Sequence, residues 1–158
     1  MQKIYIETSV VSYLTARQSK NIIIAGHQIV TKDFWDKLDI SHAFISELVL
    51  QEAGQGDAQA SQMRLEAIDQ LKELEIDEEC KKLAKILLEK KVIPNEFPED
   101  ALHIAVASVH NMDAIVTWNF KHINNPVTRK KIKTIITEEG YNSPELCSPE
   151  EFLGDNYE

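Results

Sequence analysis

Short apolar runs alternate along the chain with longer stretches in which apolar residues recur every three to four positions. The short runs are typical of strands and lie at 4–6, 43–45, 74–76 and 114–118. The longer stretches predict helices over 10–14, 21–38, 48–53, 58–71, 78–88, 99–109 and 127–137, and a further helix beginning at Ser148. The helix over 99–109 is apolar on most sides, so we expect it to be buried near the centre of the molecule.

Strands that are separated by helices pair in parallel, because a parallel connection needs a long crossover. The pattern therefore predicts an α/β fold, a three-layer α/β/α sandwich with a central, mostly parallel sheet. We expect residues 1–158 to form a single domain of this class. Pro94 and Pro98 both oppose helix continuation, so the segment between two helices at 93–99 is predicted to be a rigid loop.

Small polar residues stand before several of the predicted helices and indicate where these helices begin. Thr8 or Ser9 is the expected N-cap of the first helix, Ser46 of the helix after the second strand, and Asp77 of the helix over 78–88. Pro149 stands at the first helical position after Ser148.

Acidic and amide side chains follow the predicted strands, at the sheet edge where open parallel sheets place their sites. Glu7 directly follows the first strand, Glu52 lies six residues after Ser46, and Asn119 follows the fourth strand. Asp100 falls in the first turn of the buried helix, where the helix dipole alone would also favour it. A buried carboxylate such as Glu7 needs a partner, and three carboxylates with an amide oxygen suit Mg²⁺ or Mn²⁺.

Composition and charge narrow the function classes. The chain has 158 residues, with 17 basic and 26 acidic side chains, and a formal charge of −9. This charge argues against a broad basic face for nucleic acid but not against an enzyme that handles nucleic acid through metal-binding carboxylates. The sequence contains no G-x-x-x-x-G-K-[ST], G-x-G-x-x-G or G-x-S-x-G motif, so P-loop, dinucleotide and elbow-type acyl-transfer chemistry have no support.

The chain shows no signs of export. Its first residues contain no signal-peptide apolar core, and no apolar run approaches the length of a membrane span. Cys80 and Cys147 are too few and too far apart for a disulfide framework or a zinc site, so we expect reduced cysteines in a cytoplasmic protein.

Several further residues have both a structural and a functional interpretation. Thr8 and Ser9 are helix caps or else orient Glu7, and Thr117 supports the site or else faces a neighbouring strand. His103, one turn after Asp100, is expected to be a buried, hydrogen-bonded residue rather than a metal ligand.

The densest positive stretch follows the fourth predicted strand and consists of Lys121, Arg129, Lys130, Lys131 and Lys133. It is either a solvated helix face or a track for an RNA backbone, on which each cation offsets one phosphate. His122 lies in the same region and is a candidate substrate contact or a loop cap.

Four segments resemble the motifs of the PIN-domain family, in the order in which that family carries them. They are Tyr5-Ile-Glu-Thr-Ser-Val, Ile45-Ser-Glu-Leu-Val-Leu-Gln-Glu, Glu99-Asp-Ala-Leu-His-Ile-Ala and Ala114-Ile-Val-Thr-Trp-Asn-Phe-Lys-His. The resemblance runs from Ile4 to about Ile123. It identifies Glu7, Glu52 and Asp100 as the metal-facing carboxylates, with Asn119 at the fourth position.

The resemblance implies an endoribonuclease that depends on Mg²⁺ or Mn²⁺ and leaves a 5′-phosphate and a 3′-hydroxyl. It also implies a bacterial toxin of the VapC type, silenced by an antitoxin protein and commonly homodimeric. Two departures from the family pattern bear on activity: Glu7 stands where Asp is usual, and Asn119 stands where a fourth acid is common. The alternatives are a weak or inactive module that binds RNA or a protein partner, and, less favoured, a phosphatase or flap nuclease on a similar sheet.

Overall fold

The computed structural model describes residues 2–154, so the two ends of the predicted domain over 1–158 lie outside the described residues. Within the described part, five parallel strands form one sheet in the order β3-β2-β1-β4-β5. The strands are β1 (Ile4–Ile6), β2 (Ala43–Ser46), β3 (Lys72–Leu74), β4 (Ala114–Val116) and β5 (Glu145–Cys147). The predicted α/β/α class with a parallel sheet is confirmed.

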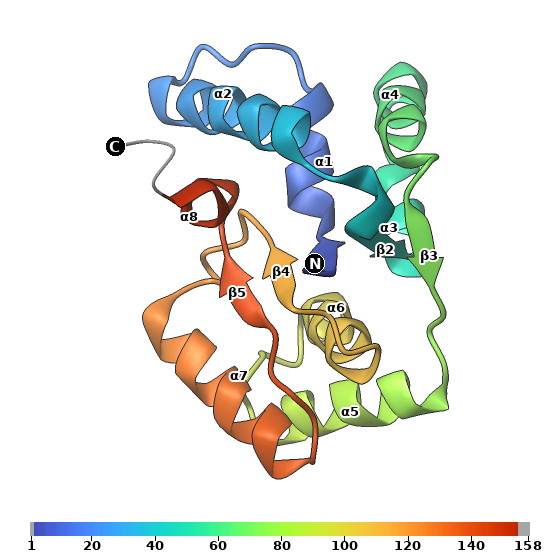
Figure 1. Ribbon diagram of the computed structural model, residues 1–158, viewed down its shortest axis with the longest axis vertical. Coiled ribbons are helices and arrows are strands. Elements are labelled where there is room, and N and C mark those ends of the chain that lie inside the picture. Colours follow the sequence, from blue (N-terminus) through green and yellow to red (C-terminus); the bar gives the residue numbers. More distant parts are fainter. Residues whose placement is uncertain (1, 155–158) are drawn as a thin grey trace.

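Helices connect consecutive strands and cover both faces of the sheet. They are α1 (Thr8–Thr15), α2 (Ile22–Lys37), α3 (Glu47–Ala53), α4 (Ala58–Ile68), α5 (Glu78–Glu89), α6 (Pro98–Val109), α7 (Pro126–Glu138) and α8 (Pro149–Leu153), with a 3-10 turn η1 (Ile40–His42) before β2. Helices α1, α2 and α8 pack against one another on one side of the sheet, and α5, α6 and α7 lie on the other (Figure 1).

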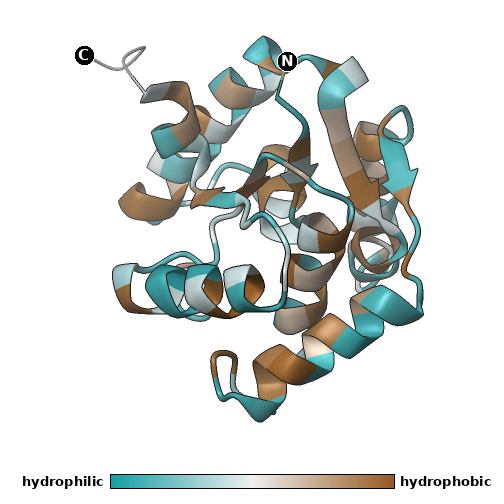
Figure 2. Ribbon diagram, turned by 60° about the horizontal axis from the view of Figure 1, so that its bottom comes forward, coloured by the Kyte–Doolittle hydropathy of each residue, from teal (hydrophilic) through white to brown (hydrophobic). Residues whose placement is uncertain are grey.

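The core lies where the strands meet α1 and α6. The residues of β1 and β4 are almost fully buried, as parallel strands covered on both faces must be. Helix α6 is buried at Ala101, Ile104 and Ala105, each with no exposed surface, which confirms its predicted central place. Helices nearer the surface alternate brown and teal segments along their length (Figure 2), because only one side of each faces the core.

Four of the five strands were predicted, and three of these four differ in their bounds. Strand β2 ends at Ser46 rather than Ile45. Strand β3 begins at Lys72 rather than Leu74, and β4 ends at Val116 rather than Trp118. The fifth strand was not predicted, because its single buried apolar residue, Leu146, stands between an exposed Glu145 and a half-buried Cys147. That short edge strand pairs with β4 and extends the sheet beyond the site.

The start of α1 differs from the prediction, whereas α3 starts where predicted but without a side-chain cap bond. The N-cap of α1 is Glu7, whose carboxylate accepts a hydrogen bond from the Ser9 amide, so Thr8 and Ser9 lie inside the helix. Ser46 occupies the predicted N-cap position of α3, but its hydroxyl bonds Tyr5 and not the helix. The Ser46 hydroxyl is therefore turned toward the neighbouring strand β1, whereas the Glu7 carboxylate caps its own helix. The cap at Asp77 and the start of α8 at Pro149 are confirmed.

The apolar face predicted for α2 is only partly buried. Phe34 is in the core, but Ile22, Ile23 and Ile29 are 86%, 67% and 67% exposed. Among the helices in residues 2–154, none combines the length and apolar character that crossing a membrane requires.

Candidate active site

The carboxyl edge of the sheet brings together the three predicted acidic residues and Asn119, from four separate stretches of the chain. Glu7 follows β1, Glu52 lies in the last turn of α3, and Asp100 lies in the first turn of α6. Asn119 lies three residues beyond the end of β4, the strand that is next to β1 in the sheet. A carboxylate oxygen of Glu7, one of Glu52 and a ring nitrogen of His103 all lie within 4.8 Å of one another.

Glu7 is buried, with 6% of its surface exposed, and hydroxyl groups hold its carboxylate. Oε2 accepts a hydrogen bond from the Ser9 amide at 3.0 Å, and Oε1 accepts hydrogen bonds from the hydroxyls of Ser9 and Thr117. The Ser9 hydroxyl also accepts a hydrogen bond from the backbone amide of Trp118 at 2.9 Å, which connects α1 to the segment after β4. Ser9 and Thr117 therefore fix the direction of the Glu7 carboxylate.

Glu52 is held from the other side by a chain of hydrogen bonds that runs into the core. Nε2 of His103 donates to Glu52 Oε1 at 2.6 Å, and the Thr8 hydroxyl donates to the same oxygen at 2.7 Å. Nδ1 of His103 is 2.7 Å from the Tyr5 hydroxyl, which is 2.9 Å from the Ser46 hydroxyl. The tyrosine and serine hydroxyls can each donate or accept, so this chain accommodates either protonation state of His103.

Asp100 lies on the opposite side of the cluster and contacts the loop after β4. Its Oδ2 is 3.0 Å from Nδ1 of His122, and its carboxylate also forms a hydrogen bond with the Asn119 side chain. Oδ1 of Asn119 accepts a hydrogen bond from the backbone amide of His122 at 3.0 Å. The His122 ring stacks on Phe97, with centroids 3.8 Å apart. Asn119 and His122 therefore both act on Asp100.

The pKa directions describe a site with too much negative charge. Burial and the nearby charge of Glu7 raise the pKa of Asp100 above its usual range, against the lowering effect of its Asn119 hydrogen bond. Burial alone would lower the pKa of His103, but the hydrogen bond to Glu52 and the surrounding carboxylates raise it overall. Burial alone would raise the pKa of Glu52, yet the bonds from His103 and Thr8 lower it.

The residues fit a divalent cation. In residues 2–154, the ion pairs formed by Glu52 and Asp100 are with histidines, and none with Lys or Arg joins the cluster. Both nitrogens of His103 are engaged with Glu52 and Tyr5, which leaves carboxylate oxygens as the available ligands. An oxygen-rich, partly buried cluster suits Mg²⁺ or Mn²⁺ better than a softer metal.

His103 has a larger part in the site than the sequence indicated. The prediction of a buried, hydrogen-bonded histidine is confirmed, with no exposed surface, but its partner is the candidate ligand Glu52. The signal was its position three residues after Asp100, which places both side chains on one face of α6. Tyr5 and Ser46 had no such signal, because Tyr5 looks like an ordinary strand residue and Ser46 like an ordinary helix cap.

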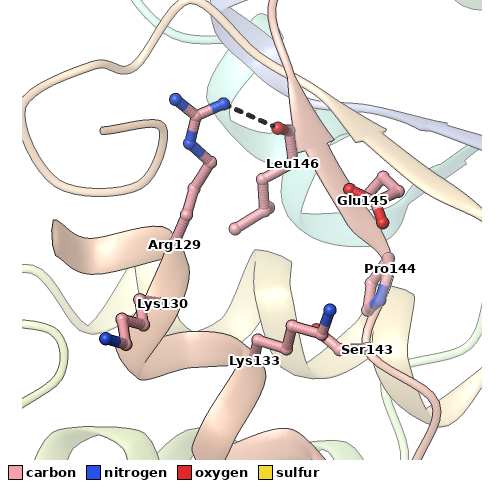
Figure 3. A pocket seen from close by; sticks show the side chains of 7 residues that line it. All are labelled: Arg129, Lys130, Lys133, Ser143, Pro144, Glu145 and Leu146. Atoms are coloured by element: carbon pink, nitrogen blue, oxygen red, sulfur yellow. Dashed lines mark hydrogen bonds between the residues drawn. The ribbon is translucent and has the colours of Figure 1, made fainter. Parts of the chain in front are cut away.

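The predicted positive track divides into two parts. Lys121 and His122 lie in the loop after β4, and His122 reaches Asp100. Arg129, Lys130 and Lys133 lie on α7 and line a pocket of about 280 Å³ beside β5. In Figure 3 the Arg129 side chain reaches toward the Leu146 carbonyl and Lys133 toward Ser143. Arg129 is also paired with Glu151 at 3.0 Å.

Replacing Ser9 by Ala removes the hydroxyl that joins Glu7 to Trp118. We expect a destabilisation of about 1–3 kcal/mol, because the buried Glu7 oxygen and Trp118 amide each lose a partner. We also expect Mn²⁺ affinity to fall by about 10–100-fold, as for groups that orient metal ligands. Urea unfolding and Mn²⁺ titration measure both. Ser12→Ala, one turn further along α1, is the matched control, and an equal effect of the two changes would contradict the assignment.

The metal-free protein should lose stability as pH rises above neutrality. The folded-state pKa of His103 lies above its ordinary value of 6.5, so the folded state binds its proton more tightly than the unfolded chain. The contribution of His103 to folding stability is complete below pH 6.5 and is lost as the pH rises through the raised pKa. Unfolding measured in a chelator at several pH values should show this slope in the wild type and a smaller slope in His103→Gln. Equal slopes of unfolding free energy against pH in the two proteins would contradict this role of His103.

Comparison with known proteins places the chain in a family. Residues 4–124 match the PIN domain model. No curated protein matches the sequence.

Solved structures with the same fold have low sequence identity to this chain. The DNA-bound VapBC of Salmonella typhimurium aligns with a TM-score of 0.60 and 16% identity, over 94% of this chain and 99% of that one. A toxin–antitoxin complex from Klebsiella pneumoniae aligns with a TM-score of 0.57 and 15% identity, over 79% and 93%. VapC20 of Mycobacterium tuberculosis, a sarcin–ricin loop cleaving toxin, aligns with a TM-score of 0.53 and 14% identity, over 87% and 95%.

Proposed function

The chain belongs to the PIN-domain family, and on that premise we propose that it is a metal-dependent endoribonuclease. The observation that carries the proposal is the approach of the Glu7 and Glu52 carboxylates, with Asp100 near enough that the charge of Glu7 adds to burial in raising its pKa. No lysine or arginine among residues 2–154 forms an ion pair with Glu52 or Asp100. Such a group is costly for a metal-free protein and is stabilised by a divalent cation.

Glu7, Glu52 and Asp100 would hold the cation, with Asn119 as an amide partner at the edge of the site. When bound, Mg²⁺ or Mn²⁺ supplies positive charge that favours deprotonation of an attacking water and stabilises a phosphodiester during cleavage. The protein's own contribution is to keep the ligands in place. Ser9 and Thr117 hold Glu7, whereas His103 and Thr8 hold Glu52. The expected products are a 5′-phosphate and a 3′-hydroxyl.

Two exposed aromatic rings suit a single-stranded substrate. Phe97 is 38% exposed and stacks on His122, which contacts Asp100, and Phe120 is 44% exposed and directly follows Asn119. Proteins commonly read single-stranded RNA by stacking unpaired bases on such rings. We therefore propose that bases next to the cleaved bond pack on Phe97 and Phe120, with Lys121 and His122 near the phosphates.

The basic residues of α7 extend the proposed path of the substrate. The pocket lies beside the start of β5, which is two strands from β1 in the sheet, so the strand axes are about 10 Å apart and the pocket is further displaced along the strands toward their amino ends. A nucleic acid strand whose cleaved bond lies at Glu7 can therefore place another phosphate near Lys130 and Lys133. Arg129 is already paired with Glu151 and contributes less free charge.

Exposed isoleucines favour a protein partner. Ile22, Ile23 and Ile29 on α2 present a large apolar surface to solvent, which is unusual for a monomer and common at interfaces. One structural neighbour is a toxin–antitoxin complex. We propose that this chain is likewise a toxin and that an antitoxin protein covers α2; a homodimer and a cytoplasmic location are part of the same proposal.

The second candidate function is a PIN-like module that binds RNA or a protein without cleaving RNA. Glu7 in place of the usual Asp and Asn119 in place of a fourth acid favour it, because the site has one negative charge fewer. Incubation of single-stranded RNA with the protein and Mn²⁺ separates the two functions. Cleavage that chelator abolishes supports the nuclease, whereas binding with intact RNA supports the module.

Replacing Lys130 and Lys133 together by Gln should weaken binding of RNA without affecting the acidic group. We expect the slope of log affinity against log salt to fall by about 1–2 units, because each phosphate contact contributes slightly less than one on a single strand. Fluorescence anisotropy with labelled RNA at several salt concentrations measures this slope. Lys81→Gln with Lys82→Gln, on α5, removes the same charge elsewhere, and an identical slope change there would refute the proposed path.

A further inference from the structure

A second cluster of metal-ligating groups lies on the other side of the molecule from α1 and α2, where α5 and α6 pack together. A carboxylate oxygen of Asp77, the sulfur of Cys80 and a ring nitrogen of His110 lie within 4.8 Å of one another. Asp77 is the N-cap of α5, Cys80 lies in its first turn, and His110 is the C-cap of α6. No zinc motif is visible in the sequence, because His110 is thirty residues from Cys80 and approaches it only through the fold.

We propose that Asp77, Cys80 and His110 form a zinc site, distinct from the acidic group at the sheet edge. One thiolate, one imidazole and one carboxylate are a donor set that suits Zn²⁺, whereas Mg²⁺ and Mn²⁺ prefer oxygen alone. Three protein ligands leave a fourth position for water or another donor.

The surroundings already orient the histidine as a ligand. Nε2 of His110 is 2.7 Å from the Glu75 carbonyl oxygen, which can only accept, so Nε2 carries the proton. The neutral ring then keeps its lone pair on Nδ1. Metal-binding histidines typically donate their other N–H to a carbonyl or carboxylate in this way. The Glu75 carbonyl thus orients the His110 ring.

The other two ligands are also positioned. Oδ1 of Asp77 accepts a hydrogen bond from the Cys80 amide at 3.0 Å, and the carboxylate also accepts hydrogen bonds from the Cys80 thiol and the Glu79 amide. Cys80 has no exposed surface, and its thiol lies 3.8 Å from the Glu75 carbonyl and also forms a hydrogen bond with the Asp77 carboxylate. Ligand atoms around a tetrahedral Zn²⁺ are about 3–4 Å apart, so small side-chain rotations bring these three atoms into place.

The site would join the start of α5 to the end of α6, the helix that carries Asp100 and His103. Binding releases the Cys80 thiol proton to solvent and replaces the weak thiol contact by a metal–sulfur bond. Asp77 and Glu79 contribute negative charge close to the thiol, which favours a cation there. Zinc would therefore stabilise the packing of these two helices.

Titration with Co²⁺ tests the site, because a cobalt–thiolate bond gives a charge-transfer absorption in the near ultraviolet that oxygen ligands do not. We expect this band in the purified full-length chain, and its loss on addition of Zn²⁺. Cys80→Ser should abolish it, and Cys147→Ser, at the other cysteine, should leave it unchanged. Absence of the band at saturating Co²⁺, or its loss in Cys147→Ser, would overturn the proposal.

Two milder variants keep the test valid if Cys80→Ser is unstable. Asp77→Asn retains a good N-cap but removes the charged ligand, and His110→Gln changes a half-buried residue at a helix end. Each should weaken Co²⁺ binding by at least about tenfold. Unchanged affinity in both would contradict the site. Asp100→Asn should keep the full band, so the outcome is independent of the proposed nuclease activity.

Discussion

Asp100→Asn should lower RNA cleavage at saturating Mn²⁺ by at least about a hundredfold, more than is typical of residues that only orient a ligand. The carboxylate of Asp100 faces Glu7 across the site, and Asn supplies neither the charge nor the second oxygen for a cation. Gel analysis of single-turnover cleavage of a labelled RNA measures the change.

The same variant should not be less stable than the wild type in the absence of metal. Burial and the charge of Glu7 raise the pKa of Asp100, so its charged form is disfavoured in the folded state and a neutral amide relieves that cost. Reduced activity with unchanged or higher thermal stability is the expected combination. Asp36→Asn, at an exposed position on α2, is the matched control. Cleavage by Asp100→Asn at the wild-type rate would remove this residue from the active site.

His103→Ala should destabilise the protein by about 3 kcal/mol or more. The substitution opens a cavity at a fully buried position and removes one of the two hydrogen-bond partners of the Tyr5 hydroxyl and one of the two of Glu52 Oε1. Urea unfolding in a chelator measures the loss without a contribution from bound metal.

Two further variants separate the packing of His103 from its hydrogen bonds. His103→Gln keeps most of the volume and one donor, so we expect it to recover part of the stability. His42→Ala removes a partly exposed histidine paired with Asp39, and it should cost no more than about 1 kcal/mol. An equal cost for His103→Ala and His42→Ala would show that the buried chain of hydrogen bonds contributes little.

The sequence predicted the fold class and the acidic residues because both depend on local signals. Four apolar runs separated by helical stretches are enough to predict a parallel sheet, and Glu7 is recognisable as an acid that directly follows a strand. Strand β5 had no such signal, since only Leu146 of its three residues is buried. It is held by pairing with β4, a long-range contact that the sequence pattern does not contain.

The burial of α2 shows the same limit. Periodicity favoured a face with Ile22, Ile23 and Ile29, yet Gln28 and Thr31 are buried instead. Gln28 is held by the backbone of the loop that precedes α2, and the Thr31 hydroxyl accepts the indole N–H of Trp118 at 2.8 Å. Specific hydrogen bonds to distant segments therefore decide which side of the helix faces inward.

The partners of the candidate site residues were likewise outside the reach of sequence reasoning. Thr8 and Ser9 were expected to cap a helix or orient Glu7. In the structure Ser9 bonds Glu7 and Thr8 bonds Glu52, which lies 44 residues away. The roles of Glu7, Glu52, Asp100 and Asn119 in metal binding remain predictions that the geometry supports.

Counting bound Mn²⁺ by electron paramagnetic resonance tests most directly whether the edge of the sheet is a metal site. Titration of the Cys80→Ser protein avoids any contribution from the second cluster. We predict one Mn²⁺ per chain, displaced by excess Mg²⁺, and loss of that ion when either Glu7→Gln or Asp100→Asn is added. Absence of bound Mn²⁺ in the Cys80→Ser protein would contradict a metal site at this edge of the sheet. Mn²⁺ binding that is unchanged when Glu7→Gln and when Asp100→Asn is added would contradict it as well.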